Sequence, residues 1–177
     1  MNRLKYGEAP LAPWLAYLQS SKHRYREVVS SIPFSSEPIA LLDIGTTPFT
    51  LFIKQVYPHY KVSTLDLTEY MEPRCKAMGI QFKTCDLDKV HIPFDDSCFD
   101  VVVFCEVLEH LFVPPTNILN EIRRIMRPEG KLVLSVPNIA ALYQRIRLLF
   151  GISPLPNADD QMAKGLHVPH IHEYTMS

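Results

Sequence analysis

A chain of 177 residues, 47% of them hydrophobic, is long enough to form one domain with a substantial core. The net charge of -1 and the lack of a run of Lys or Arg argue against nucleic acid and membrane partners. Without a signal peptide pattern or an apolar stretch of roughly 20 residues, we expect a cytoplasmic protein. The scattered cysteines fit reduced thiols better than a disulfide frame; they are Cys75, Cys85, Cys98 and Cys105.

Apolar periodicity in the first half of the chain predicts helices that alternate with strands. Residues 11–31 carry apolar side chains at helical spacing, and Pro33 follows them. Residues 39–44 form the apolar run expected of a strand buried on both faces. The alternation continues with a helix over 49–57, a strand over 61–66, a helix over 69–78 and a strand over 80–85.

The second half of the chain continues this alternation. It predicts, in order, a strand over 99–105, a helix over 116–126, a turn over 127–130, a strand over 131–136 and a helix over 138–150. Strands that alternate with helices indicate an α/β fold, with a doubly wound, mostly parallel sheet and helices on both faces. We therefore expect a single domain over 1–177, with an N-terminal helical cap (1–32), a ligand-binding core (38–137) and a final helix with a histidine-rich tail near the substrate mouth (138–177).

Acidic residues follow the first three predicted strands, at the sheet edge where doubly wound folds bind ligands. Asp43-Ile44-Gly45 ends the first strand, and its glycine allows a ligand to approach the backbone. The negative charge of Asp43 favours a cationic ligand over a phosphate. Asp66 ends the second strand, at the spacing of an acid that binds ribose hydroxyls, and Asp86 ends the third. Each acid alone also fits a helix cap or a surface residue.

Several segments, in order and spacing, resemble the class I, Rossmann-like methyltransferases that use S-adenosylmethionine, in the group that acts mostly on small molecules. The resemblance covers residues 39–175. Its motifs are LLDIG at 41–45, VSTLDL at 62–67, IPFDDSCFDVV at 92–102, EVLEHL at 106–111, EIRRIMRPEG at 121–130, VPN at 136–138 and HEYT at 172–175. The family fold implies the strand order 3-2-1-4-5.

The resemblance implies that the strand ends bind S-adenosylmethionine. The glycine turn would hold the methionine end, the second strand end the ribose and the third strand end the adenine. Glu106 would also line the acceptor pocket, and Asp43 would support the turn or bind the amino group. The cofactor residues implied in this way are Asp43, Gly45, Thr46, Asp66, Leu67, Asp86, Leu87 and Glu106.

The chain departs from the family pattern in two places. Thr47 and Phe49 occupy the positions of the second and third glycines of the usual turn, so a side chain at 47 would crowd the cofactor carboxylate and Pro48-Phe49 would reshape the loop. The last two strands of the usual seven are also absent from the sequence, which ends at residue 177. We therefore expect the strand over 131–136 to be an exposed edge, open to a partner or to self-association.

The cluster Glu106-x-x-Glu109-His110 supplies the acid–base candidates, with His110 as a general base and Glu106 beside it. Glu109 and His110 also fit a purely structural role in the loop. The cluster resembles the small-RNA 3′-end 2′-O-methyltransferases, in which such residues and a later histidine hold a divalent ion. By that resemblance the ligands would be Glu106, Glu109, His110 and one of His167, His170 and His172, with His170 the best placed.

We therefore predict a methyltransferase that uses S-adenosylmethionine to modify a small molecule, at oxygen. One alternative is a methyltransferase-like binding or scaffold domain without turnover, which the missing glycines and strands would explain. A second alternative is a metal-assisted 2′-O-methyltransferase. Our main prediction includes no metal.

Overall fold

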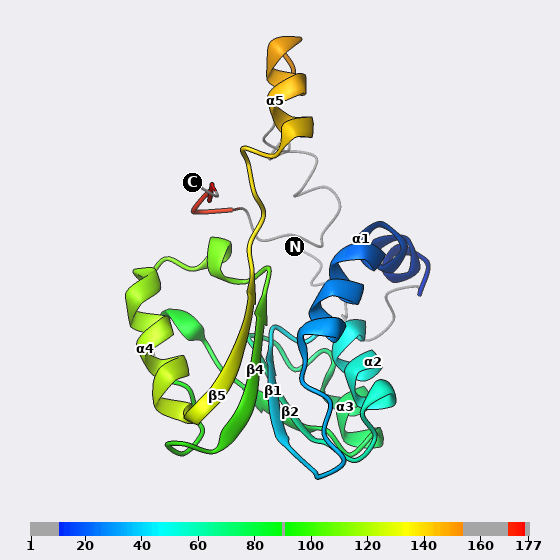
Figure 1. Cartoon of the computed structure of the whole chain (residues 1–177), viewed down its shortest axis with the longest axis vertical. Coiled ribbons are helices and arrows are strands. Elements are labelled where there is room, and N and C mark those ends of the chain that lie inside the picture. Colours follow the sequence, from blue (N-terminus) through cyan, green and yellow to red (C-terminus); the bar gives the residue numbers. More distant parts are fainter. Residues whose placement is uncertain (1–10, 90, 154–169, 176–177) are drawn as a thin grey trace, which may run out of the picture.

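The computed structural model describes residues 11–89, 91–153 and 170–175 and contains a five-stranded parallel sheet (Figure 1). The strand order β3-β2-β1-β4-β5 confirms the predicted Rossmann-like α/β fold. The strands are β1 (Ala40–Ile44), β2 (Lys61–Asp66), β3 (Gln81–Thr84), β4 (Phe99–Cys105) and β5 (Met126–Ser135). The chain reverses its winding direction between β1 and β4, so a ligand crevice is expected where these two strands end.

Helices cover both faces of the sheet, with α1, α2 and α3 on one side and α4 on the other (Figure 1). The helices are α1 (Leu11–Ser31), α2 (Pro48–Val56), α3 (Glu72–Ala77), α4 (Pro115–Ile125) and α5 (Leu142–Leu149), with short 3-10 turns at Leu87–Lys89 and Leu108–His110. α5 differs from the others because it projects away from the sheet, beyond the ends of the strands (Figure 1).

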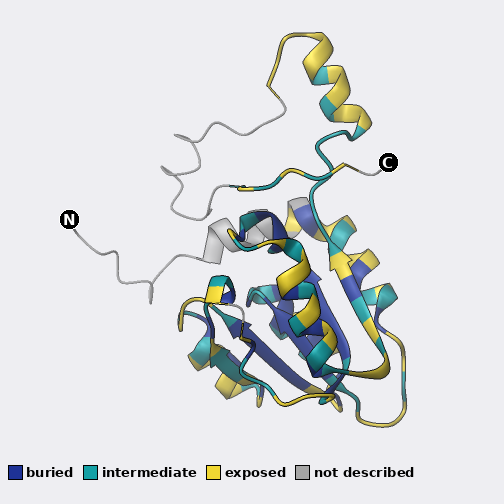
Figure 2. Ribbon diagram, turned by 90° about the vertical axis from the view of Figure 1, so that its left-hand side faces the viewer, coloured by how far each residue is buried: buried dark blue, intermediate teal, exposed yellow. Residues whose placement is uncertain are grey.

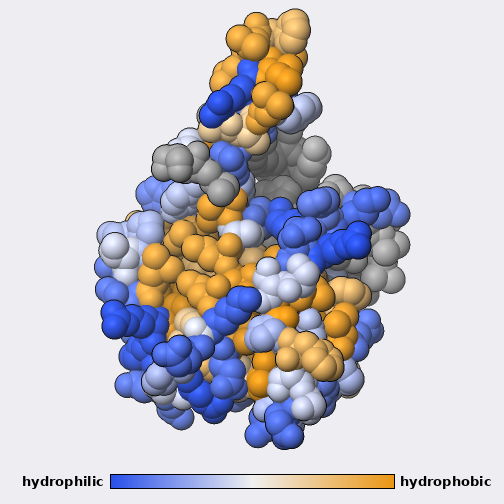
Figure 3. Space-filling model, viewed as in Figure 1, coloured by the Kyte–Doolittle hydropathy of each residue, from blue (hydrophilic) through white to orange (hydrophobic). Residues whose placement is uncertain are grey.

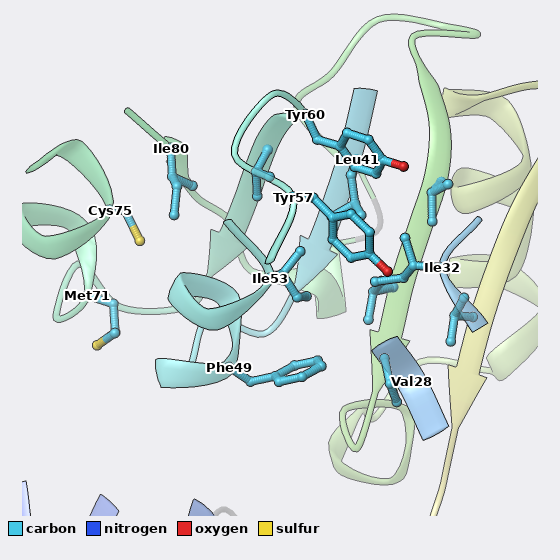
Figure 4. Close-up of a cluster of buried hydrophobic side chains, with 14 residues drawn as sticks. Val28, Ile32, Leu41, Phe49, Ile53, Tyr57, Tyr60, Met71, Cys75 and Ile80 are labelled. Atoms are coloured by element: carbon cyan, nitrogen blue, oxygen red, sulfur yellow. The ribbon is translucent and has the colours of Figure 1, made fainter. Parts of the chain in front are cut away.

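Two apolar clusters, one on each face, hold the helices against the sheet. The first joins α1, α2 and α3 to the strands through residues such as Val28, Ile53 and Cys75 (Figure 4). The second joins α4 to the opposite face through Ile118 and Ile122. Figure 2 shows buried residues along the central strands, which explains why the predicted strand over 39–44 is a continuous apolar run.

The structure corrects the predicted turn over 127–130, because these residues lie within β5. The pairing of β4 with β5 shifts register between Phe99 and Val101, and Glu129 has a φ of +65° there. Residues 127–130, opposite Asp100, form a bulge in β5. An ion pair between Arg127 and Asp100, with an N–O distance of 2.6 Å, connects the two strands there. The run Pro128-Glu129-Gly130 is typical of a turn, but in the structure it bends β5 and does not end it.

The predicted helix over 138–150 is also shorter than expected. α5 begins at Leu142, because the backbone around Asn138 pairs with the tail instead, in a parallel bridge to Tyr174. The amide of Ile139 donates to the carbonyl of Tyr174 over 3.1 Å. The histidine-rich tail therefore returns to the end of β5, close to the base of α5.

In the described part of the chain β5 has one neighbour, β4, so its other side is a sheet edge as predicted. Within the same residues, none of the helices combines the length and the apolar character that a membrane crossing requires.

Candidate functional site

The turn after β1 requires a glycine at position 45. Gly45 has a φ of +90°, a conformation that residues with a side chain rarely adopt. Its amide donates to the carbonyl of Leu65 over 3.0 Å, which ties the turn to β2. A Cβ atom at Gly45 would lie 2.6 Å from Cγ2 of Val107, so the space beside the turn is already filled on the β4 side.

The side chains that replace the other two glycines point away from the turn. Thr47 caps α2, since its hydroxyl accepts from the amide of Phe49 over 3.2 Å, and Thr50 completes a capping box. Phe49 is buried and stacks on Tyr25 of α1, with ring centroids 4.2 Å apart. The helix therefore begins without the usual glycines, because these two side chains are used for capping and for the core.

Asp43 lies beneath the turn and supports it. Its side chain is buried, and the Thr50 hydroxyl donates to Oδ2 over 2.6 Å. Burial raises the pKa of Asp43 to about 7; the Thr50 hydrogen bond opposes this shift and the neighbouring Asp66 adds to it. Of the two predicted roles, the geometry favours support of the turn over contact with a ligand. The charge argument from the sequence loses force, because burial disfavours the charged form of this carboxyl group.

Asp66 lies beside the glycine turn, as the sequence predicts. The amide of Thr46 donates to Oδ2 of Asp66 over 2.9 Å, and the amide of Thr68 donates to Oδ1 over 3.0 Å. Burial raises the pKa of Asp66, while these hydrogen bonds lower it. The next residue, Leu67, is 61% exposed. A fixed carboxylate and an exposed apolar side chain thus stand together at the end of β2. Oδ1 of Asp66 also accepts from the Thr68 hydroxyl over 3.4 Å, whereas Oδ2, which accepts from the Thr46 amide, keeps room for a further donor.

The end of β3 contributes a partly exposed carboxylate, Asp86, and a buried apolar side chain, Leu87. Oδ1 of Asp86 accepts from the amide of Asp88 over 3.1 Å, and Oδ2 pairs with Lys89 at the same distance. Leu87 is only 8% exposed and belongs to the core. Leu67 therefore offers more apolar surface to a flat ring than Leu87 does, and Leu87 packs in the core instead.

Glu106 ends β4 in a left-handed conformation with a φ of +57°, which is unusual for a residue with a side chain. Its Oε2 atom pairs with the guanidinium of Arg24 over 2.7 Å, and Oε1 accepts from the Ser135 hydroxyl over 3.0 Å. Glu106 thereby joins α1 to the ends of β4 and β5. Sequence reasoning missed Arg24, because it lies 82 residues from its partner and in no motif.

Glu109, His110 and His170 come together at the end of β4. Each offers one ligand atom, and these atoms lie within 4.8 Å of one another. Glu109 is 1% exposed, and its Oε2 atom has no hydrogen-bond partner among the described residues. Burial raises the pKa of Glu109 to about 7. The rings of His110 and His170 meet edge to face, with centroids 5.0 Å apart.

The tail is held in this cluster by its backbone. The amides of Ile171 and His172 both donate to the carbonyl of Glu109, over 2.7 and 3.1 Å. Nδ1 of His170 lies 3.1 Å from an oxygen of Glu173. The structure thus assembles three of the four predicted metal ligands, while the carboxylate of Glu106 contacts Arg24 and Ser135 instead. His167 lies outside the described residues.

Comparison with known proteins identifies the class to which this site belongs. Residues 42–134, just over half of the chain, match the methyltransferase domain family. The chain belongs to this family, and S-adenosylmethionine is the cofactor that the membership implies. The matched segment runs from β1 to β5, so it includes the glycine turn, Asp66 and Glu109.

Two individual methyltransferases are similar to the chain at about one quarter identity. The chain is 26% identical over 117 residues to the demethylmenaquinone methyltransferase of Thermus thermophilus, covering 63% of this chain and 53% of that protein. It is 25% identical over 146 residues to the malonyl-[acyl-carrier protein] O-methyltransferase of Alcanivorax borkumensis, covering 76% and 49%. The structure of a geranyl diphosphate methyltransferase with GPP and sinefungin matches with a TM-score of 0.58 at 16% identity, over 80% of this chain and 58% of that one. The chain spans about half the length of these two curated relatives.

Proposed function

We propose that the protein is a methyltransferase that uses S-adenosylmethionine. The observation that carries the proposal is the Gly45 turn beside Asp66 and the exposed Leu67, at the point where the sheet reverses its winding. The turn carries no side chain at Gly45, where Val107 already occupies the place of a Cβ, so no Cβ of this residue separates a ligand from the backbone. Asp66 supplies acceptors for a diol, and Leu67 supplies an apolar surface for a flat ring.

These residues fit the parts of S-adenosylmethionine that they would bind. We propose that Gly45 and Thr46 contact the methionine end, Asp66 the ribose hydroxyls and Leu67 the adenine ring, with Asp86 near the exocyclic amine. The bound cofactor supplies an activated methyl group on a sulfonium. The protein then has to align an acceptor with that methyl group and to exclude water, so no covalent catalytic residue is required.

For the acceptor we propose a small molecule that is methylated at oxygen. Support comes from the relative that acts on malonyl-[acyl-carrier protein] at oxygen and from the relative that acts on demethylmenaquinone. Glu109 and His110 would then receive the proton that an acceptor hydroxyl loses, because they lie together where β4 ends. Through its ion pair, Glu106 would hold Arg24 near the acceptor, at the end of β4.

We also infer a cytoplasmic location and an association through the free edge of β5. The described residues contain four free cysteines, which suits a reducing compartment. The edge of β5 extends over ten residues and exposes Leu134, so it offers backbone donors and acceptors to another strand.

Calorimetry with S-adenosylmethionine and S-adenosylhomocysteine tests the main proposal. We expect both ligands to bind at one site per chain, and sinefungin to compete with them. Binding with methyl transfer to an offered hydroxyl acceptor supports the enzyme. Binding without transfer to any acceptor offered favours the scaffold alternative, and no heat from either ligand with folded protein would contradict the enzyme.

A second candidate function is metal-assisted methyl transfer, and we propose Glu109, His110 and His170 as ligands of a divalent cation. The observation that favours it is the buried Oε2 atom of Glu109, which has no partner and lies in a cluster whose ligand atoms are within 4.8 Å. A carboxylate with two imidazoles is a donor set that Mn²⁺ and Zn²⁺ accept. The cation would orient an acceptor oxygen and favour its deprotonated form.

The cation proposal predicts that Mn²⁺ raises the melting temperature of the ligand-free protein. At a concentration about 100 times the dissociation constant the increase should be roughly 5–10 °C. The variants Glu109→Gln and His170→Ala should lose this increase, whereas His91→Ala should keep it, because His91 is exposed and lies before β4. An equal increase in all four proteins, or none in the unmodified one, would count against the site.

A further inference from the structure

Among the helical residues whose side chains the structure describes, those of α5 include the most exposed large apolar side chains. Leu149 is 84%, Phe150 77% and Leu142 74% exposed, and α5 has no buried residue. By contrast, α4 buries Ile118, Ile122 and Ile125 against the sheet. Figure 3 shows the apolar surface of α5 standing clear of the domain. Apolar surface on this scale in water marks an interaction site.

The sequence nevertheless specifies α5 as a helix with a defined end. Gly151 has a φ of +69°, and its amide donates to the carbonyl of Leu148 over 2.9 Å. The amide of Ile152 donates to the carbonyl of Arg147 over 2.9 Å, which completes a Schellman motif. A helix of eight residues is marginal in water without packing. α5 therefore needs a surface on which its apolar side chains are covered.

The charges around α5 indicate the chemistry of that surface. At 100° per residue, five apolar side chains share one arc, which we name the apolar face of α5; they are Leu142, Tyr143, Ile146, Leu149 and Phe150. Arg145 lies beyond one border of this arc and Arg147 beyond the other. From Asn138 to Ser153 the sequence contains these two arginines and no acidic residue. An apolar face bordered by arginines matches an anionic lipid surface. The apolar side chains would contact the acyl chains, and the arginines would reach the lipid phosphates.

The base of α5 is fixed with respect to the candidate site. Asn138, before α5, bridges to Tyr174, and the tail around Tyr174 is held on Glu109 by backbone hydrogen bonds. In Figure 1, α5 projects from the edge of the sheet at which the strands end. A surface that covers α5 therefore meets the same end of the molecule as the proposed methyl-transfer site.

We propose that α5 docks on the surface of an anionic lipid bilayer, which departs from the expectation drawn from the net charge of the whole chain, because the charge that borders α5 is that of two arginines. The apolar face of α5 enters the boundary between headgroups and acyl chains, and Arg145 and Arg147 contact lipid phosphates. This is attachment to one leaflet, which is compatible with the lack of a membrane-spanning helix in the described residues. The cytoplasmic leaflet carries the anionic lipids that such a face prefers. Docking rests on α5 alone and does not require the proposed methyl transfer.

Sedimentation of the 177-residue chain with vesicles tests this proposal. We expect binding to vesicles of phosphatidylcholine with phosphatidylglycerol, and roughly 10- to 30-fold weaker binding to phosphatidylcholine alone, because two arginines contribute to the difference. The double variant Leu149→Ser/Phe150→Ser should lose at least about tenfold in affinity for the mixed vesicles. The double variant Arg145→Glu/Arg147→Glu should lose the preference for anionic lipid.

Two matched controls use exposed residues away from α5. Phe34→Ser removes an apolar side chain that is 85% exposed, and Arg123→Glu reverses an exposed charge on α4. Both controls should bind vesicles as the unmodified protein does. The proposal is overturned if the unmodified protein ignores mixed vesicles or if the controls lose as much affinity as the α5 variants. It is also overturned if α5 instead mediates a dimer in vesicle-free solution that the serine variant dissolves.

Discussion

Replacing Gly45 by alanine is expected to destabilise the protein by about 2–5 kcal/mol and to weaken binding of S-adenosylmethionine at least about tenfold. A residue with a Cβ costs about 1–2 kcal/mol at the φ of +90° that this position requires. The new methyl group would also lie 2.6 Å from Cγ2 of Val107, and forcing an atom into a filled space costs about 1–3 kcal/mol. Denaturant unfolding and calorimetry measure the two effects.

A second glycine separates these two causes. Gly79 has a similar φ, +68°, but nothing lies within 4 Å of the Cβ that alanine would add there. Gly79→Ala should therefore show the backbone cost alone and leave cofactor affinity unchanged. The double variant Gly45→Ala/Val107→Ala, compared with Val107→Ala, should recover the part of the loss caused by the contact. Equal losses for Gly45→Ala and Gly79→Ala would show that the contact with Val107 has no effect.

Replacing Asp66 by asparagine is expected to weaken binding of S-adenosylmethionine by about 10- to 100-fold with little loss of stability. Asparagine keeps one oxygen that can accept from the amide of Thr46, so the turn after β1 should remain in place. It removes the charged acceptor that we assign to the ribose hydroxyls, and a hydrogen bond to a charged group is worth about 1.5–3 kcal/mol. Calorimetry gives the affinity, and thermal unfolding confirms the fold.

A ligand lacking the ribose hydroxyls distinguishes a direct contact from a structural effect. The unmodified protein should bind S-adenosylhomocysteine much more tightly than its 2′,3′-dideoxy analogue, whereas Asp66→Asn should bind the two almost equally. Asp95→Asn is the matched control, because Asp95 is an exposed acid that precedes β4 and so lies at the other end of the sheet. If Asp66→Asn kept the full preference for the hydroxyls, the assignment of Asp66 to the ribose would be wrong.

The sequence was sufficient to predict the sheet and the edge of it at which the acidic strand ends lie. The apolar runs are buried strands, and in a parallel sheet their acidic ends must meet at one edge, so Asp43, Asp66 and Asp86 could be grouped without coordinates. The same argument placed the turn at Gly45. Local pattern and topology together determine these positions, because each residue lies within two residues of the end of its strand.

Other features depend on contacts between distant segments, and no local pattern encodes them. The ion pair from Arg24 to Glu106 joins α1 to β4, and the backbone contact of the tail with Glu109 joins segments more than 60 residues apart. The bulge in β5 depends on the register with β4. The roles of Thr47 and Phe49 were equally hidden, since the helix cap and the stacking on Tyr25 appear only once α1 and α2 are packed.

The topology also divides the site between two parts of the chain. Groups assigned to the cofactor follow β1, β2 and β3, whereas Glu106, Glu109 and His110 follow β4, and His170 reaches them from the tail. The segment between Asn138 and Tyr174 is anchored at both ends, because these two residues form a bridge. Changes in its length or composition can therefore leave the strand ends in place. Under the proposed function, exchanging this one segment would change the acceptor, while the residues assigned to the methyl donor would stay in place.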